Sequence, residues 1–132
     1  MPTPKSILPL LTLVACLAGC GSGRPLTATA IQLGRSLNSD RTVGGFTTTF
    51  APDDTIYLSV LTGNAGSATI RVRWKYGDRV IDEPRKQVSY SDAAATNFRL
   101  QSPGGFPRGD YTAEVFVNDQ PFGTRAFRVE AR

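Results

Sequence analysis

The sequence predicts an all-β protein, a two-sheet antiparallel sandwich that follows an N-terminal leader. Three observations support this fold class. From about residue 27 onward, apolar and polar residues alternate with a period of two, as in half-buried strands. Clusters of Gly, Pro, Asn and Asp separate these runs, as turns require. No run in this region has the apolar spacing of a helix.

Residues 1–19 have the pattern of an export signal. Lys5 lies in a short polar start, and an apolar run from Ile7 to Gly19 follows it. A permanent bilayer-spanning helix needs about 20 apolar residues. This run is shorter, and Gly21-Ser22-Gly23 follows it in place of a stop-transfer cluster. We therefore expect a signal peptide that is cleaved.

The segment Leu17-Ala18-Gly19-Cys20 resembles the lipobox of bacterial lipoproteins. The resemblance implies cleavage before Cys20 and attachment of diacylglycerol and palmitate-type acyl chains, which anchor the protein in the cell envelope. Cys16 is an alternative, but cleavage there leaves a shorter apolar run. Gly21 stands where an aspartate tends to retain a lipoprotein in the inner membrane. The family pattern therefore implies the outer membrane, with the domain facing the periplasm.

This cleavage divides the chain into a signal peptide (1–19), a lipidated tether (20–26) and one domain (27–132). The tether contains Gly, Ser and Pro and leaves the orientation of the domain free. The remaining length is enough for one domain with a modest core, but not for two.

The clearest predicted strand runs from Thr69 to Tyr76, and a second runs from Asp54 to Thr62. Successive side chains on a strand point to opposite faces. The residues expected to face the core are Ile56, Leu58 and Val60 on the earlier strand and Ile70, Val72, Trp74 and Tyr76 on the later one. Turn-forming residues 63–67 would make the two strands neighbours, like strands B and C of a sandwich.

Seven further runs are predicted as strands, of which 79–81 and 86–90 are the weaker ones, so we expect about seven or eight strands, enough for a two-sheet sandwich. They cover residues 28–37, 46–50, 79–81, 86–90, 97–100, 111–117 and 124–130. The side chains expected inward on the last two are Tyr111, Ala113, Val115, Val117, Phe127 and Val129. Residues 118–121 are expected to form a hairpin loop.

Two positions resemble the immunoglobulin pattern. Trp74 falls on the strand corresponding to strand C, and Tyr111 precedes the inward Ala113 as in a tyrosine corner. Val60 and Ala113 stand where the inter-sheet cysteines would be, so the resemblance concerns architecture. Residues 49–57, 73–76, 103–111 and 127–130 together resemble an uncharacterised immunoglobulin-like module of bacterial lipoproteins and periplasmic proteins. That resemblance implies a fold and a location, and brings no catalytic motif.

The composition argues against most kinds of chemistry. The chain has no histidine and only two cysteines, both in the leader segment, which excludes Ser-His-Asp and Cys-His catalysis and His or Cys sites for zinc or haem. The formal charge of +4 is too small and scattered to indicate nucleic-acid binding. We therefore expect a protein that is not an enzyme and that holds no cofactor.

Carboxylates are the remaining reactive groups. The pairs Asp53-Asp54 and Asp82-Glu83 are adjacent to prolines and point to opposite faces, so they are expected to be turn residues rather than a hydrolase pair. A calcium site that combines Asp53 and Asp54 with Asp110 or Asp119 is a weaker alternative.

Three cations, Arg71, Arg73 and Lys75, share the outward face of the clearest strand and repeat at roughly 7 Å. Arginine favours phosphate and carboxylate, so this stripe is a candidate site for lipopolysaccharide or wall polymer, unless Glu114 on a neighbouring strand neutralises it. Tyr57 and Phe116 are expected to point away from the core, where a contact patch is a weaker alternative to singly exposed aromatic residues. Phe106 is expected to plug the end of the sandwich. The sequence thus predicts a non-catalytic, membrane-anchored binding or scaffolding module with an envelope partner. The alternative is an envelope anion binder.

Overall fold

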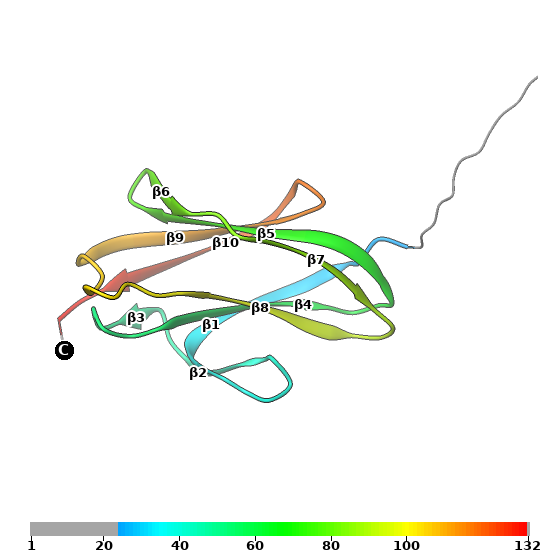
Figure 1. The fold of residues 1–132 in the computed structure, drawn as a ribbon, viewed down its shortest axis with the longest axis horizontal. Coiled ribbons are helices and arrows are strands. Elements are labelled where there is room, and N and C mark those ends of the chain that lie inside the picture. Colours follow the sequence, from blue (N-terminus) through cyan, green and yellow to red (C-terminus); the bar gives the residue numbers. More distant parts are fainter. Residues whose placement is uncertain (1–23, 132) are drawn as a thin grey trace, which may run out of the picture.

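A computed structural model describes residues 24–131 as two β-sheets packed face to face (Figure 1). This part of the chain consists of strands joined by turns and loops, and it contains no helix that is long and apolar enough to cross a membrane. Its ten strands are β1 (Ala28–Leu37), β2 (Val43–Phe46), β3 (Thr49–Phe50), β4 (Ile56–Thr62), β5 (Gly66–Tyr76), β6 (Arg79–Asp82), β7 (Arg85–Tyr90), β8 (Ala94–Leu100), β9 (Gly109–Val117) and β10 (Gln120–Val129). The predicted signal peptide and Cys20 lie outside the described residues.

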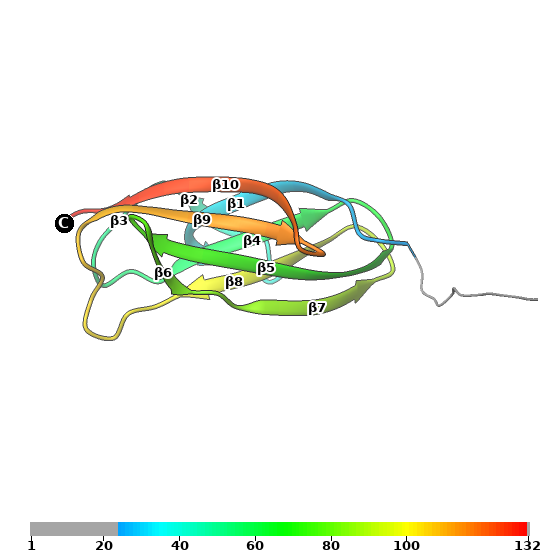
Figure 2. The same ribbon diagram turned by 90° about the horizontal axis from the view of Figure 1, so that it is seen from above.

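The predicted two-sheet sandwich is confirmed. One sheet has the strand order β2-β1-β4-β8, and the other has β3-β10-β9-β5 with β6 and β7 both paired to β5 (Figure 2). Among the ten strands, all pairings are antiparallel except that of β3 with β10. The consecutive strands β4 and β5 lie in different sheets, as strands B and C of a sandwich do, so they face each other instead of forming a hydrogen-bonded pair.

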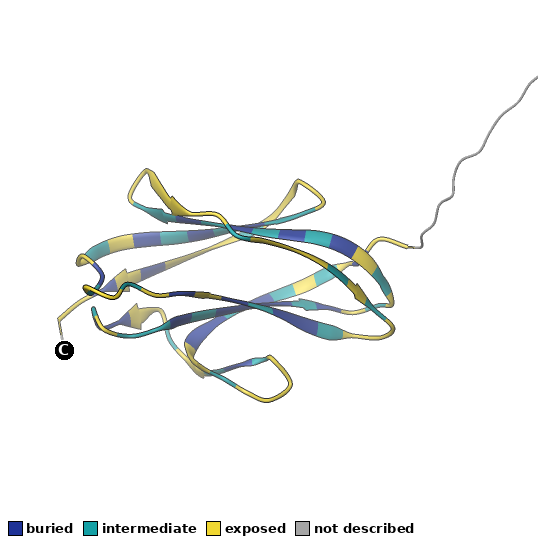
Figure 3. Cartoon of the chain, in the orientation of Figure 1, coloured by how far each residue is buried: buried dark blue, intermediate teal, exposed yellow. Residues whose placement is uncertain are grey.

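The core lies between the sheets and has the predicted period of two (Figure 3). The predicted inward residues of β4, β5, β9 and β10 are buried, except that Tyr76 and Val117 at two strand ends are only partly buried and pack against the core. Trp74 is fully buried, and its indole N–H finds no hydrogen-bond acceptor among the described residues. The alternation therefore located the core correctly.

The predicted strand at 46–50 is instead two strands in different sheets. The Thr47 hydroxyl accepts a hydrogen bond from the amide of Thr49 (3.0 Å) and turns the chain between them. As a result, Phe46 ends β2 and is exposed, whereas Phe50 lies on β3 and is fully buried. The number of strands is ten rather than seven or eight, because β2 and β3 are separate strands and because β6 and β7 are both formed.

The fold begins slightly earlier than residue 27. Leu26 is buried in the core and its amide donates to the carbonyl of Ser67 (3.1 Å), while the amide of Ser67 donates to the carbonyl of Arg24 (3.0 Å). The last residues of the predicted tether therefore belong to the domain. The β9–β10 turn is also tighter than predicted: Asn118 and Asp119 both have positive φ (51° and 66°), as a two-residue type I′ hairpin requires.

Tyr111 organises the end of the sandwich at which β9 begins. Its hydroxyl donates to the carbonyl of Pro107 (2.5 Å), the bond that defines a tyrosine corner. Its ring stacks between Tyr76 and Phe127 at centroid distances of 4.7 and 5.3 Å. Phe106 packs edge-on against it and is buried, as predicted for a plug at this end.

Replacing Tyr111 with Phe should lower the free energy of unfolding by about 1 to 2 kcal/mol, because the ring packing stays while a partly buried hydrogen bond is lost. Urea denaturation of the two proteins measures the difference. Tyr57→Phe is the matched control, since the hydroxyl of Tyr57 makes no hydrogen bond within residues 24–131. Equal loss in both variants would contradict a specific contribution from the tyrosine corner.

Candidate functional site

The predicted basic stripe exists, and the central strand β5 positions it. Arg71, Arg73 and Lys75 alternate with the buried residues Val72 and Trp74, so all three point to the outer face of the sheet. Their side chains are not free in solvent, with exposed fractions of 13%, 34% and 24%.

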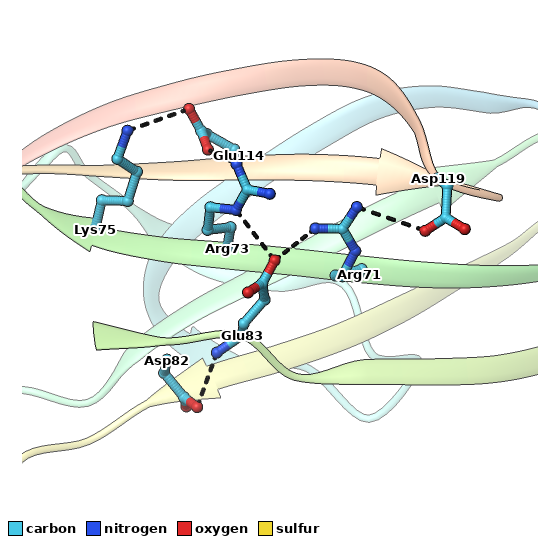
Figure 4. Close-up of polar contacts among 7 residues, drawn as sticks. All are labelled: Arg71, Arg73, Lys75, Asp82, Glu83, Glu114 and Asp119. Carbon is cyan, nitrogen blue, oxygen red and sulfur yellow. Dashed lines mark hydrogen bonds and ion pairs between the residues drawn. The ribbon is translucent and has the colours of Figure 1, made fainter. Parts of the chain in front are cut away.

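Carboxylates from three other segments neutralise the stripe (Figure 4). Glu83 bridges Arg71 and Arg73 through one oxygen, at 2.5 and 3.0 Å. Glu114 pairs with Arg73 at 3.2 Å and with Lys75 at 3.7 Å. Asp119 approaches Arg71 at 3.5 Å. Three cations therefore face three carboxylates, and the net charge of the group is close to zero.

The strand arrangement explains these pairs. Glu114 is the register partner of Arg73 on β9, so the predicted cross-strand neutralisation occurs. Glu83 comes from the short segment between β6 and β7, which both pair with the same edge of β5. Hydrogen bonds from Arg73 and Arg71 lower the pKa of Glu83 below its usual 4.5, and the same bond from Arg73 raises the pKa of that guanidinium.

Phe116 forms the floor of this network. The guanidinium carbons of Arg71 and Arg73 lie 4.0 and 4.9 Å from the centroid of its ring, close enough for cation–π attraction. Phe116 points away from the core as predicted, but it is half-covered by the two arginines, and Tyr57 is likewise half-buried. The exposed large apolar residues among those described are instead Phe46, Val80, Ile81 and Phe122.

The aspartates proposed for calcium are dispersed. Asp110 is the second residue of β9 and pairs with Arg128, whereas Asp119 follows the other end of that strand. Asp54 accepts a hydrogen bond from the amide of Ala51 (2.7 Å) and pairs with Arg35. Within residues 24–131, no three side chains of the His, Cys, Asp or Glu type gather in a way that holds a metal ion.

A cavity of about 270 Å³ lies beside the tyrosine corner. The sequence did not predict this cavity. The aromatic rings of Tyr76, Phe106 and Tyr111 line it together with Arg79 and Asp82. Its lining comes from β5, β6, β9 and the loop after β8, so no single stretch of sequence marks it.

The sequence matches no protein-family model and no curated protein. Among solved structures, an immunoglobulin-like protein from Pseudomonas aeruginosa is similar with a TM-score of 0.55 at 12% identity, covering 83% of this chain and all of that one. A β-glucosidase from Listeria innocua in complex with glucose has a TM-score of 0.49 at 11% identity; the match covers 77% of this chain but only 16% of the enzyme.

At these identities the likeness concerns the fold alone. The fold is an immunoglobulin-like β-sandwich.

Replacing Glu83 with Gln should destabilise the protein at neutral pH but not in acid. Because the folded-state pKa of Glu83 is lowered, its ion pairs contribute stability above the unfolded-state value of about 4.5, and this contribution is lost as the pH falls through the folded-state pKa. Urea unfolding between about pH 7 and pH 3 should show the gap between wild type and variant closing. Asp78→Asn, at an exposed residue without an ion pair in the described part of the chain, should show a gap that does not depend on pH.

Proposed function

We propose that this chain is a lipid-anchored, non-catalytic module of the bacterial cell envelope that binds or scaffolds another envelope component. The anchor is Cys20, and the expected location is the outer membrane, with the domain facing the periplasm. The observation that carries the proposal is the short distance along the chain between the lipobox and the fold. Arg24 is already held by Ser67, only four residues after Cys20.

Four residues span at most about 15 Å when fully extended. A domain attached through Cys20 therefore stays close to the membrane surface, with the end that Arg24 enters turned toward it. This end carries the turns at residues 63–65, 91–93 and 118–119. The opposite end, where the described chain ends in Figure 1, is the end available to a partner.

The available end has the features of a contact surface. Val80 and Ile81 on β6 are exposed at 46% and 38%, and Ile81 adjoins the 270 Å³ cavity. Neighbouring exposed apolar residues beside an aromatic-lined hollow are typical of protein contact sites. The alternative function, anion binding through Arg71, Arg73 and Lys75, has less support, because carboxylates already pair with all three cations.

Cys20→Ser should abolish the incorporation of labelled palmitate, because the thiol that accepts the lipid is lost. Cys16→Ser is the matched control and should keep the label. Labelling of cells that produce each variant, followed by intact-mass measurement, decides the outcome. Retention of the label in the Cys20 variant would mean that another residue carries the lipid and would refute the assignment.

The partner is best sought by mild cross-linking in native membranes, followed by mass spectrometry of what is recovered. Val80→Ser combined with Ile81→Ser should reduce recovery of the partner several-fold, because both side chains belong to the contact surface at the available end. Phe122→Ser is the control, since this residue is equally exposed but lies on β10 next to the membrane-facing turn at 118–119.

A third arm replaces Arg71, Arg73 and Lys75 with Ser. Recovery of a protein partner that survives this change supports the scaffold role. Recovery of lipopolysaccharide or wall fragments that disappear with it supports the alternative and contradicts the proposal.

A further inference from the structure

A second group of cations lies near Asn97 on β8. Its members are Arg41, Lys86 and Arg99. They come from the β1–β2 loop, from β7 in one sheet and from β8 in the other. The group therefore spans the margin where the two sheets meet.

Contacts around Asn97 place the ammonium of Lys86 and the backbone of Arg41, and strand spacing places Arg99. The ammonium of Lys86 donates to the backbone carbonyl of Asn97 (2.5 Å) and lies 5.0 Å from the centroid of the Phe98 ring. Arg99 is two residues further along β8 on the same face, roughly 7 Å away. Ser59, the register partner of Asn97, donates its hydroxyl hydrogen to the carbonyl of Arg41 (2.5 Å).

Carboxylates do not neutralise this group, in contrast to the stripe on β5. None of the three cations forms an ion pair within residues 24–131. Asp40, which precedes Arg41, instead accepts hydrogen bonds from the amide and the hydroxyl of Thr42 (3.0 and 2.5 Å). Partial burial, and then repulsion from Arg41 and Arg99, lowers the pKa of Lys86.

The backbone of Arg41 is also unusual. Its φ of 71° lies in the left-handed region, which glycine and asparagine adopt far more easily than a long side chain does. The loop closes through hydrogen bonds between Asn38 and both Arg41 and Thr42. A strained residue at such a position is a reason to look for a role of its side chain.

We propose that Arg41, Lys86 and Arg99 form a binding site for a phosphate group at the margin of the sandwich. Two arginines and one lysine that come from three neighbouring elements and pair with no carboxylate in the described part of the chain supply the positive charge and the forked donors that phosphate favours. This proposal adds a class of ligand, molecules that carry a phosphate group, to the binding role proposed above. It does not require that Cys20 be lipidated, so either proposal can fail without the other.

Calorimetric titration of the full chain, in neutral detergent at low ionic strength, tests the site with inorganic pyrophosphate as the probe. Wild type should bind it saturably. The double variant Arg41→Gly with Arg99→Ser should bind at least about tenfold more weakly, since two charge-assisted contacts are lost. Because glycine relieves the strain at position 41, Arg41→Gly alone should weaken binding without lowering resistance to urea.

The matched control is Arg108→Ser with Arg125→Ser. These two exposed arginines lack ion pairs in the described part of the chain, so the control removes the same charge from elsewhere. It should change the affinity by less than about twofold. Equal weakening in both double variants, or no saturable binding by wild type, overturns the proposal.

Glycerophosphoglycerol, the soluble headgroup diester of an anionic lipid, identifies the source of the phosphate. Binding of this diester that is lost in the Arg41 and Arg99 variant supports a lipid headgroup. Binding of pyrophosphate alone, lost in the same variant, supports a soluble or polymer-borne phosphate.

Discussion

The structure depends on one geometric constraint, the alternation of side chains along β5. This strand is paired on both edges, with β9 on one side and β6 and β7 on the other. Its inward residues include Val72 and Trp74 at the centre of the core, and the residues between them carry the cations of the stripe. A shift by one residue would bury the cations and expose the tryptophan, so the core and the ion-pair network fix the same register.

Buried apolar side chains from both sheets take the place of the cross-link that joins the sheets in antibody domains, and within the larger sheet aromatic rings pack on one another. Val60 and Ala113, at the positions corresponding to the paired cysteines, are fully buried. Around them, Phe127 contacts Phe50, Trp74 and Tyr111 at centroid distances of 5.5, 6.1 and 5.3 Å. Rings of this size each remove about 150 to 250 Å² from water, so a few of them stabilise a small sandwich substantially. Residues 24–131 contain no cysteine, so the packing of this part of the chain involves no disulfide.

Local patterns in the sequence were sufficient for much of the fold. The bounds of β1, the inward faces of β4 and β9 and the tyrosine corner all follow from alternation or from short spacings, which are properties of neighbouring residues. The division of 46–50 into two strands depends on whether Phe46 or Phe50 finds a partner strand, which is a tertiary outcome. The same limit applies to the sites: Glu114 opposite Arg73 follows from strand pairing, whereas Glu83 and the group of Arg41, Lys86 and Arg99 meet only through the folding of distant segments.

The two terminal strands have a mechanical consequence. The described chain enters the fold at one end, beside β1, and leaves it at the other, after β10 (Figure 1). A force pulling these ends apart acts along the strands, whereas the inter-strand hydrogen bonds lie across them. The bonds between β1 and β4, and between β10 and β9, would then be loaded in shear and would share the force instead of opening one after another. Such a sandwich can bear a pulling force that is applied between its two ends.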